Sequence, residues 1–229
     1  MEKELKIPTH LGFIVDGNRR WARERGLPTL EGHRKGFNQV EEIALASVKR
    51  GVKFTSFYLF STENWDRSKE EVDYLMKLLR QNIKKLTKKF KAEGIRILWM
   101  GRNEPAPEDI QEQLRESEKE TADGKSGTVC VCFNYGGQWE IADAVTKIIA
   151  AGIKKITPEV IAENLYHPEV PACDMIVRTS GEERISGFQL WRAAYSEFLF
   201  LDKYFPDMKV ADLDGVLEEF ASRHRRFGK

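Results

Sequence analysis

Short apolar runs alternate with longer amphipathic segments along this 229-residue chain, and this alternation constrains the fold more than any other feature of the sequence. Most runs are continuously apolar, which is typical of parallel strands buried on both faces. The predicted strands are residues 12–15, 54–60, 95–100, 128–133, 175–177 and 198–201. The predicted helices are residues 36–49, 69–91, 108–120, 139–150, 158–165 and 213–224. The pattern predicts one α/β domain over residues 1–229, with a mostly parallel central sheet flanked by helices.

In open parallel sheets, ligands bind beyond the carboxyl ends of the strands, so the loops after the predicted strands are expected to carry function. The first such loop is Asp16-Gly-Asn-Arg-Arg-Trp21. Its carboxylate can hold a cation, and Gly17 lets the backbone come close to a phosphate. Arg19 and Arg20 supply positive charge. Taken alone, this stretch is equally compatible with an ordinary turn.

A polar cluster bracketed by aromatic residues follows the second strand, from Ser61 to Arg67. Asn64 and Arg67 are suited to orient a polar group or to assist a proton transfer. The alternative is purely local, with Ser61 or Thr62 capping a turn and Asn64 bonding to the nearby backbone.

The loop after the fifth strand, residues 178–188, combines arginines, hydroxyl groups and glycines. Arg178 and Arg184 can present several donors to phosphate oxygens, and Ser186 can add another. A surface loop with salt bridges is the alternative. After the fourth strand, Gly136 and Gly137 permit a tight turn or a close approach to a ligand.

Glu197 stands at the start of the last strand, where a carboxylate is unusual unless it is paired or metal-bound. The sequence predicts that Asp16 and Glu197 bracket one hard cation. Mg²⁺ fits best, because proteins commonly hold it with one or two carboxylates plus substrate phosphates.

Composition excludes several other classes of protein. A net charge of +1 gives no overall attraction for nucleic acid. Cys130, Cys132 and Cys173 lack the spacing of a zinc site or a disulfide framework, so we expect reduced core thiols. The sequence contains no apolar run long enough to span a membrane and no signal-peptide pattern. We therefore expect a cytoplasmic protein, with peripheral membrane contact left open.

The longest predicted helix carries an apolar stripe, while its lysines lie mostly elsewhere. The stripe consists of Val72, Leu75, Met76, Leu79, Ile83, Leu86 and Phe90. Packing against the core is the simplest interpretation. The stripe would also suit a membrane surface or the wall of an apolar channel.

Taken in order, these segments resemble the cis-prenyltransferases, the undecaprenyl diphosphate synthase family. The resemblance runs from about Pro8 to the C-terminus. The matching motifs are Asp16-Gly-Asn-Arg-Arg-Trp21, Gly32-His33, Phe60-Ser-Thr-Glu-Asn-Trp65 with Arg67, Asn134-Tyr-Gly-Gly137, and Arg178-Thr-Ser-Gly-Glu182 with Arg184, Ser186, Trp191, Tyr195 and Glu197. Members condense isopentenyl diphosphate with an allylic diphosphate, forming new Z double bonds. The resemblance implies a dimeric, Mg²⁺-dependent enzyme with an apolar product tunnel and no organic cofactor.

The resemblance also implies a role for each matched residue. Asp16 would hold the metal ion, and Glu197 would help to place it. The residues implied at the allylic diphosphate are Gly17, Asn18, Arg19 and Arg20, with His33 close to it, and Trp21 is implied as a further substrate-binding residue. Those implied at isopentenyl diphosphate are Arg178, Arg184 and Ser186, with a C-terminal tail of Arg226 and Gly228.

The segment after the second strand would carry the proton-transfer step. Asn64 and Arg67 would assist proton loss, and Trp65 would position the isopentenyl group. The remaining substrate-binding residues implied there are Ser61, Thr62 and Glu63.

Three positions depart from the family pattern. Thr29 stands where bacterial long-chain members commonly carry an arginine, so part of the allylic site is missing or is supplied by Arg34, Lys35 or another group. Leu59 occupies a tunnel position that is small in long-chain members, which implies a short-to-medium product. Gly101-Arg102 replaces a Gly-Asp pair, with an effect that the resemblance does not give.

Two other functions compete with an active prenyltransferase. A non-catalytic subunit of a cis-prenyltransferase complex would keep the fold but lose the diphosphate-site residues. The presence of Asp16, Asn64, Arg178 and Glu197 favours an enzyme. A nucleotide-binding regulator is disfavoured, because the sequence contains neither of the common glycine-rich phosphate-binding motifs.

Overall fold

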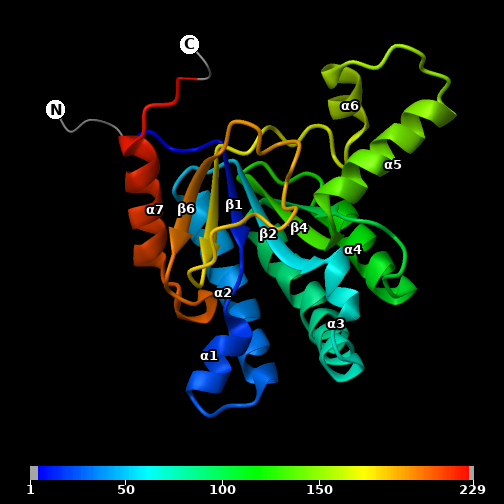
Figure 1. The fold of residues 1–229 in the computed structure, drawn as a ribbon. Helices are drawn as coiled ribbons and strands as arrows, with labels where there is room; N and C mark the ends of the chain where they lie inside the picture. The colour runs from blue at the N-terminus through cyan, green and yellow to red at the C-terminus, as the bar shows by residue number, and fades with distance from the viewer. Residues whose placement is uncertain (1–4, 227–229) are drawn as a thin grey trace.

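A computed structural model describes residues 5–226 and places six strands in one sheet in which every pairing is parallel (Figure 1). The strands are β1 (His10–Ile14), β2 (Phe54–Ser61), β3 (Ile95–Met100), β4 (Gly127–Tyr135), β5 (Met175–Thr179) and β6 (Glu197–Leu201). Their order across the sheet is β3-β4-β2-β1-β5-β6. The predicted α/β fold with a parallel central sheet is confirmed.

Helices connect and cover these strands. The α helices are α1 (Asn18–Glu24), α2 (Thr29–Lys49), α3 (Lys69–Ala92), α4 (Glu108–Glu120), α5 (Gly137–Ala150), α6 (Pro158–Asn164) and α7 (Val210–Ser222). Two short 3₁₀ helices are η1 (Thr62–Asp66) and η2 (Phe205–Asp207). Each predicted element is present; β3 and α4 have the predicted bounds, and the other elements have one or both ends shifted. The largest differences are that α2 begins at Thr29 rather than at residue 36, and that α1 was not among the predicted helices.

The two faces of the sheet have different covers, because alternate strand residues point in opposite directions. Leu11 and Phe13 of β1 belong to the core formed with α2 and α7. On the other face, Ile14 packs in a cluster with Phe188. The cysteines Cys130, Cys132 and Cys173 are buried free thiols in that second cluster, as expected.

The apolar stripe of α3 packs mainly against the core, as its simplest interpretation predicts. Met76 and Ile83 lie in a cluster with Trp99 and Phe133 from β3 and β4. Leu75 of the same stripe also lines a cavity described below. Within residues 5–226, none of the helices combines the length and apolar character needed to cross a bilayer.

His10 is a fully buried titratable group at the start of β1. Its Nδ1 lies 2.9 Å from the carbonyl oxygen of Pro171, and its Nε2 lies 2.7 Å from the hydroxyl of Ser56. A carbonyl oxygen only accepts, so Nδ1 carries the proton and Nε2 accepts from Ser56. Burial lowers the pKa of His10 from 6.5 to about 4.

Replacing His10 with Gln should therefore remove part of the acid sensitivity of folding. The folded-state pKa of His10 is depressed, so its unfolded form takes up a proton first as the pH falls below 6.5. Between pH 7.5 and pH 5 this should cost the wild type about 2 kcal/mol of unfolding free energy. Denaturant titrations of both proteins at the two pH values measure the difference. An equal loss in wild type and His10→Gln would contradict this assignment.

Candidate active site

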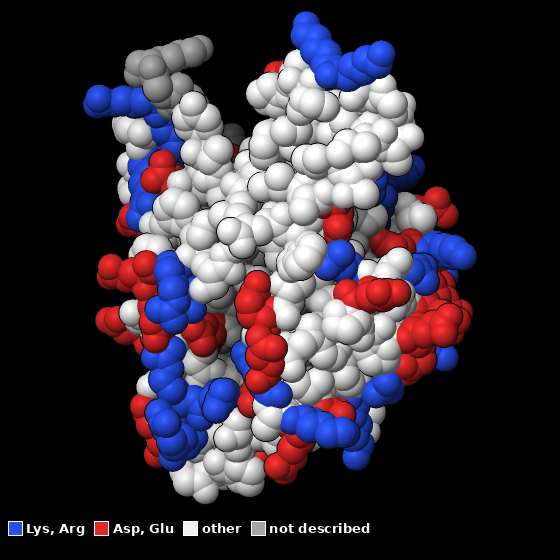
Figure 2. All heavy atoms as spheres, turned by 45° about the vertical axis from the view of Figure 1, so that its right-hand side comes forward, with Lys and Arg blue, Asp and Glu red and all other residues white. Residues whose placement is uncertain are grey.

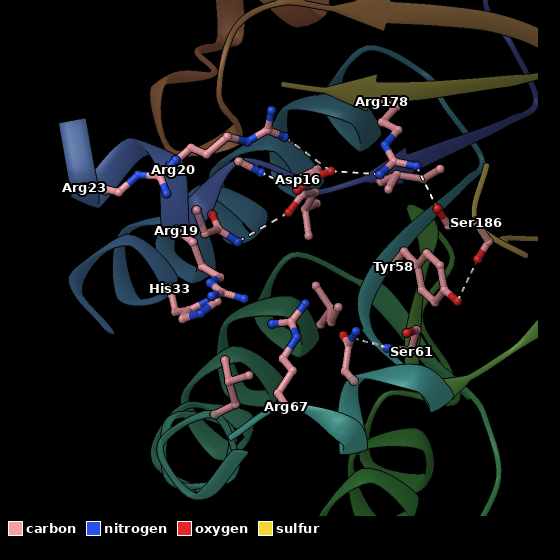
Figure 3. A pocket seen from close by; sticks show the side chains of 17 residues that line it. Asp16, Arg19, Arg20, Arg23, His33, Tyr58, Ser61, Arg67, Arg178 and Ser186 are labelled. Atoms are coloured by element: carbon pink, nitrogen blue, oxygen red, sulfur yellow. Dashed lines mark hydrogen bonds and ion pairs between the residues drawn. The ribbon is translucent and has the colours of Figure 1, made fainter. Parts of the chain in front are cut away.

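A cavity of about 420 Å³ opens beyond the carboxyl ends of β1, β2 and β5 (Figure 3). The strands β1 and β5 are neighbours, but the chain leaves β1 toward β2 on the other side, so the strand order reverses here. The predicted residues that line the cavity are Asp16, Gly17, Asn18, Arg19, Arg20, His33, Ser61, Asn64, Arg67, Arg178 and Ser186. The structure therefore brings together three loops that are distant in sequence.

The turn after β1 depends on a glycine. Gly17 has a φ of +102°, and a Cβ there would lie 2.6 Å from the ring of Tyr204. The carbonyl oxygen of Asp16 accepts from the Thr179 hydroxyl at 2.7 Å and from the Phe205 amide at 3.1 Å. The backbone is thus fixed while the Asp16 side chain points into the cavity (Figure 3).

The carboxylate of Asp16 is the point where the two halves of the cavity meet. Its Oδ2 accepts from Nη2 of Arg178 at 2.8 Å and lies 3.7 Å from Nη2 of Arg20. Its Oδ1 accepts from the amide of Gly17 at 2.7 Å. About a third of the Asp16 side chain is exposed, so it remains accessible to a ligand.

Close packing of α1 on α2 builds the basic wall of the cavity. A Cβ at Gly32 would lie 1.9 Å from the carbonyl oxygen of Asn18, and one at Gly36 would lie 2.2 Å from its Oδ1. These two glycines, four residues apart on α2, let the first turn of α1 rest directly on that helix. The same contact carries His33 of α2 into the cavity wall beside Arg19 (Figure 3).

The opposite wall is built around Arg178 at the end of β5, whose side chain is only 5% exposed. Nη1 of Arg178 donates to the hydroxyl of Ser186 at 2.9 Å. Ser186 has a φ of +48° and is followed by Gly187 at +76°, so the loop turns back over the strand end. The Tyr58 hydroxyl donates to the carbonyl oxygen of Ser186 at 3.3 Å. Arg178 and Ser186 are thus brought together in one cavity wall, while their binding of a diphosphate stays a prediction.

A second carboxylate, Glu182, stands outside the cavity lining and pairs with Arg20 and Arg184. Its Oε1 is 3.2 Å from Nη1 of Arg20, and its other oxygen accepts from Arg184. Arg20 also donates to the hydroxyl of Ser180. Arg184 is 61% exposed and stands outside the cavity lining, although it was predicted to bind diphosphate.

The polar cluster after β2 makes the local cap considered for it and also contributes to the cavity lining. Oδ1 of Asn64 accepts from the amide of Ser61 at 3.1 Å, which is the local cap expected of a simple turn. Ser61 and Asn64 nevertheless line the cavity together with Arg67. The indole of Trp65 instead donates to Oδ1 of Asn134 at 2.8 Å. The predicted residues of this cluster outside the cavity lining are Thr62, Glu63 and Trp65.

Trp21, predicted for substrate binding, stands outside the cavity lining. Its indole donates to Oδ1 of Asp207 at 2.7 Å. The departure at Arg102 is also explained by local contacts. Its Nε donates to Asp143 at 3.0 Å, and its guanidinium lies 3.9 Å from the centre of the Trp139 ring.

Glu197 lies at the other end of the sheet from Asp16. The strand register aligns Glu197 with Met175, and Met175 with Leu11. Asp16 comes five residues after Leu11, a separation of about 16 Å along the strands. The expected bracketing of one cation by Asp16 and Glu197 is therefore not formed within a single chain. Arg226 also lies outside the cavity, and Gly228 is beyond the described residues.

The cavity lining also includes residues that the sequence analysis missed. Arg23 lines the cavity from α1, the helix that also carries Arg19 (Figure 3). Arg19 precedes Arg23 by four residues. That spacing places both guanidiniums on one helix face, so the signal was present in the sequence. Arg34 and Lys35, considered as substitutes for the arginine missing at Thr29, stand outside the cavity lining, and Arg34 pairs with Glu31 at 2.6 Å.

The donor set fits a metal ion that is shared with a substrate. No group of three His, Cys, Asp or Glu side chains suited to a metal occurs within residues 5–226. Asp16 is the carboxylate that lines the cavity, among several arginines. A single carboxylate with phosphate and water ligands suits Mg²⁺. Burial among the cavity walls lowers the pKa of His33 from its ordinary value of 6.5.

Replacing Arg23 with Ala should weaken binding of inorganic diphosphate about tenfold, because a charge-assisted contact is lost. Isothermal titration calorimetry measures the dissociation constant. Arg25→Ala is the matched control: Arg25 pairs with Asp207 at 2.9 Å, outside the cavity lining, and its loss should change the constant less than twofold. Equal effects of the two substitutions would exclude Arg23 from the site.

Comparison with known proteins agrees with this geometry. The prenyltransferase family model, described as undecaprenyl diphosphate synthase, matches residues 14–228. The isoprenyl transferase of Thermotoga maritima is 41% identical over 98% of this chain and 98% of its own length. The decaprenyl diphosphate synthase of Mycobacterium leprae is 42% identical over 97% of this chain and 77% of its own.

A solved structure is similar over the same extent. Lavandulyl diphosphate synthase from Lavandula x intermedia, in complex with dimethylallyl diphosphate, superposes with a TM-score of 0.93. It is 31% identical, over 97% of this chain and 99% of that one. The chain is thus similar in fold and in sequence to prenyl diphosphate synthases over nearly its whole length. It belongs to the undecaprenyl diphosphate synthase family of prenyltransferases.

Proposed function

We propose that this chain condenses isopentenyl diphosphate with an allylic diphosphate and releases diphosphate and a Z-polyprenyl diphosphate. The observation that carries this proposal is one cavity with two guanidinium walls and the Asp16 carboxylate between them. Two anionic groups can bind there side by side. Relatives that are polyprenyl diphosphate synthases support the reaction class.

The proposed reaction breaks the bond between the allylic carbon and its diphosphate oxygen, which keeps the electron pair. The terminal alkene carbon of isopentenyl diphosphate bonds to the allylic carbon, and a proton is then lost. Arg19, Arg20 and Arg23 would stabilise the charge that develops on the leaving diphosphate. Arg178 and Ser186 would hold isopentenyl diphosphate, while Asn64 and Arg67 would assist proton loss.

Asp16 would hold a Mg²⁺ ion next to both diphosphates. When bound, such an ion neutralises charge on the leaving group. The contact between Asp16 and Arg178 supports this placement, since it sets the carboxylate at the boundary between the two walls.

The proposed enzyme is a homodimer in which the C-terminal tail of one chain completes the cavity of its partner. Arg223 pairs with Glu197 at 3.1 Å, and Arg225 pairs with Asp174 beside the start of β1. The tail is therefore anchored at the end of the sheet away from its own cavity. Glu197 and Arg226 would reach an Asp16 site only on another chain.

We also propose a cytoplasmic enzyme with peripheral membrane contact, because its product is apolar. Figure 2 shows an extensive area without charged residues on the face that carries α5 and α6. Ile149, Ile153 and Ile156 are 71%, 40% and 50% exposed. Lys154 and Lys155 lie among them in sequence, which suits an anionic membrane surface.

A short-to-medium product follows from the position of Leu59. This residue lines both the main cavity and an adjoining apolar hollow of about 50 Å³. Phe37, Leu75 and Leu79 also line the hollow. A growing prenyl chain that leaves the diphosphate walls would enter this hollow and meet Leu59.

Replacing Leu59 with Ala should lengthen the product by at least one isoprene unit, because it enlarges the hollow. Radiolabelled isopentenyl diphosphate and chromatography of the products measure chain length. Leu86→Ala is the control, since Leu86 packs against the core outside the lining of the hollow. If the Leu59→Ala product is no longer than that of the wild type, Leu59 is not the stop.

Replacing Asp16 with Ala should reduce turnover at least about a hundredfold and change allylic diphosphate binding less than about threefold, since the metal site is lost and the arginines remain. Magnesium-dependent incorporation of isopentenyl diphosphate into a butanol-soluble product measures turnover, with dimethylallyl, geranyl, farnesyl and geranylgeranyl diphosphates as primers. A wild type inactive with every primer, yet able to bind another family member, would indicate a non-catalytic subunit.

A further inference from the structure

Glu71 is a buried carboxylate that the proposed reaction leaves without a role. It is the third residue of α3 and only 8% exposed. Its amide donates to the Ser68 side chain at 3.4 Å, which closes the first turn of the helix. A carboxylate in this position is favoured by the helix dipole.

Three cationic or basic side chains from other segments converge on this carboxylate. Oε1 of Glu71 lies 3.0 Å from Nε2 of His33 and accepts from Nη1 of Arg67 at 2.8 Å. Its Oε2 lies 3.7 Å from Nη1 of Arg19. All three partners line the cavity, whereas Glu71 itself lies behind its wall. Figure 3 shows Arg19, His33 and Arg67 turned toward one another.

Charge balance explains why a carboxylate is needed at this place. The described lining of the cavity has five arginines, Arg19, Arg20, Arg23, Arg67 and Arg178, and the Asp16 carboxylate. Asp16 is paired with Arg178 and lies 3.7 Å from Arg20, so it does not offset the charge of Arg19 and Arg67. Burying a carboxylate costs desolvation free energy, and the ion pairs that it forms seldom give a net gain in folding stability. Glu71 therefore acts mainly by fixing the positions of the side chains that contact it.

We propose that Glu71 is a positioning residue that holds His33 and Arg19 in the orientation that receives the allylic substrate and holds Arg67 in place for proton loss; this inference rests on the proposed function. Without Glu71, Arg19 and Arg67 would repel each other and turn toward water. Nε2 of His33 would lose its partner. Arg178 and Ser186 make no contact with Glu71 among the described interactions, so the isopentenyl side should remain intact.

The test measures both substrates in the same variants. For Glu71→Ala we expect KM for the allylic diphosphate to rise about tenfold and kcat to fall about tenfold, while KM for isopentenyl diphosphate changes less than twofold. Glu71→Gln keeps an oxygen that accepts and should show a smaller shift of the same kind. If Glu71 had a purely structural role, its replacement would lower the melting temperature but would leave the ratio of the two KM values unchanged.

Glu118→Ala is the matched control. Glu118 lies on α4, accepts from the Trp99 amide at 2.8 Å and lies 2.9 Å from Nε2 of His167. Like Glu71, it is a helical carboxylate in contact with a histidine. It stands outside the cavity lining, and its replacement should leave the ratio of the two KM values unchanged. If Glu71→Ala fails to fold, the ratio in Glu71→Gln decides the question.

Equal changes in both KM values, or changes below twofold in all parameters, would overturn the role of Glu71. A wild-type chain that binds both diphosphates without transferring a prenyl group would contradict the proposed function alone. In that case calorimetry would measure the dissociation constants of the two diphosphates. The positioning role would stand if Glu71→Gln raised the constant for the allylic diphosphate and left the constant for isopentenyl diphosphate unchanged.

Discussion

The ion pair between Asp16 and Arg178 is the contact on which the site depends. It joins the loop after β1 to the end of the neighbouring parallel strand β5 and so links the two guanidinium walls. The left-handed turn at Gly17 follows Asp16 directly, and the return of the chain at Ser186 and Gly187 brings the Ser186 hydroxyl to Arg178. A parallel arrangement of β1 and β5 brings both loops to one edge, so fold and site follow from the same constraint.

Much of this arrangement could be predicted from the sequence, because continuous apolar runs identify buried parallel strands and the residues after them must meet at one edge. Asp16, Asn64, Arg178 and Ser186 were located in this way. The same rule could have separated Glu197 from Asp16. A residue at the start of a parallel strand lies at the opposite edge from residues that follow one.

Other features were not accessible to pattern analysis. The α1 segment lacks the apolar periodicity that identifies a helix, and it forms because Gly32 and Gly36 of α2 accept it at close range. Trp21 and Trp65 are next to cavity-lining residues in the sequence, but their indole groups donate hydrogen bonds to Asp207 and Asn134. Tertiary hydrogen bonds of this kind determine side-chain direction and leave no signal in sequence spacing.

The contact of Asp16 with Arg178 also has a thermodynamic consequence. Asp16 and Arg178 pair with each other, so a cation bound to Asp16 would free the Arg178 guanidinium for a phosphate. A phosphate bound to Arg178 would likewise free the Asp16 carboxylate for a cation. Affinities at two linked sites must change each other by the same factor. A metal ion at Asp16 and a diphosphate at Arg178, bound as proposed, would therefore be coupled ligands, and the saturation curve of each would depend on the concentration of the other.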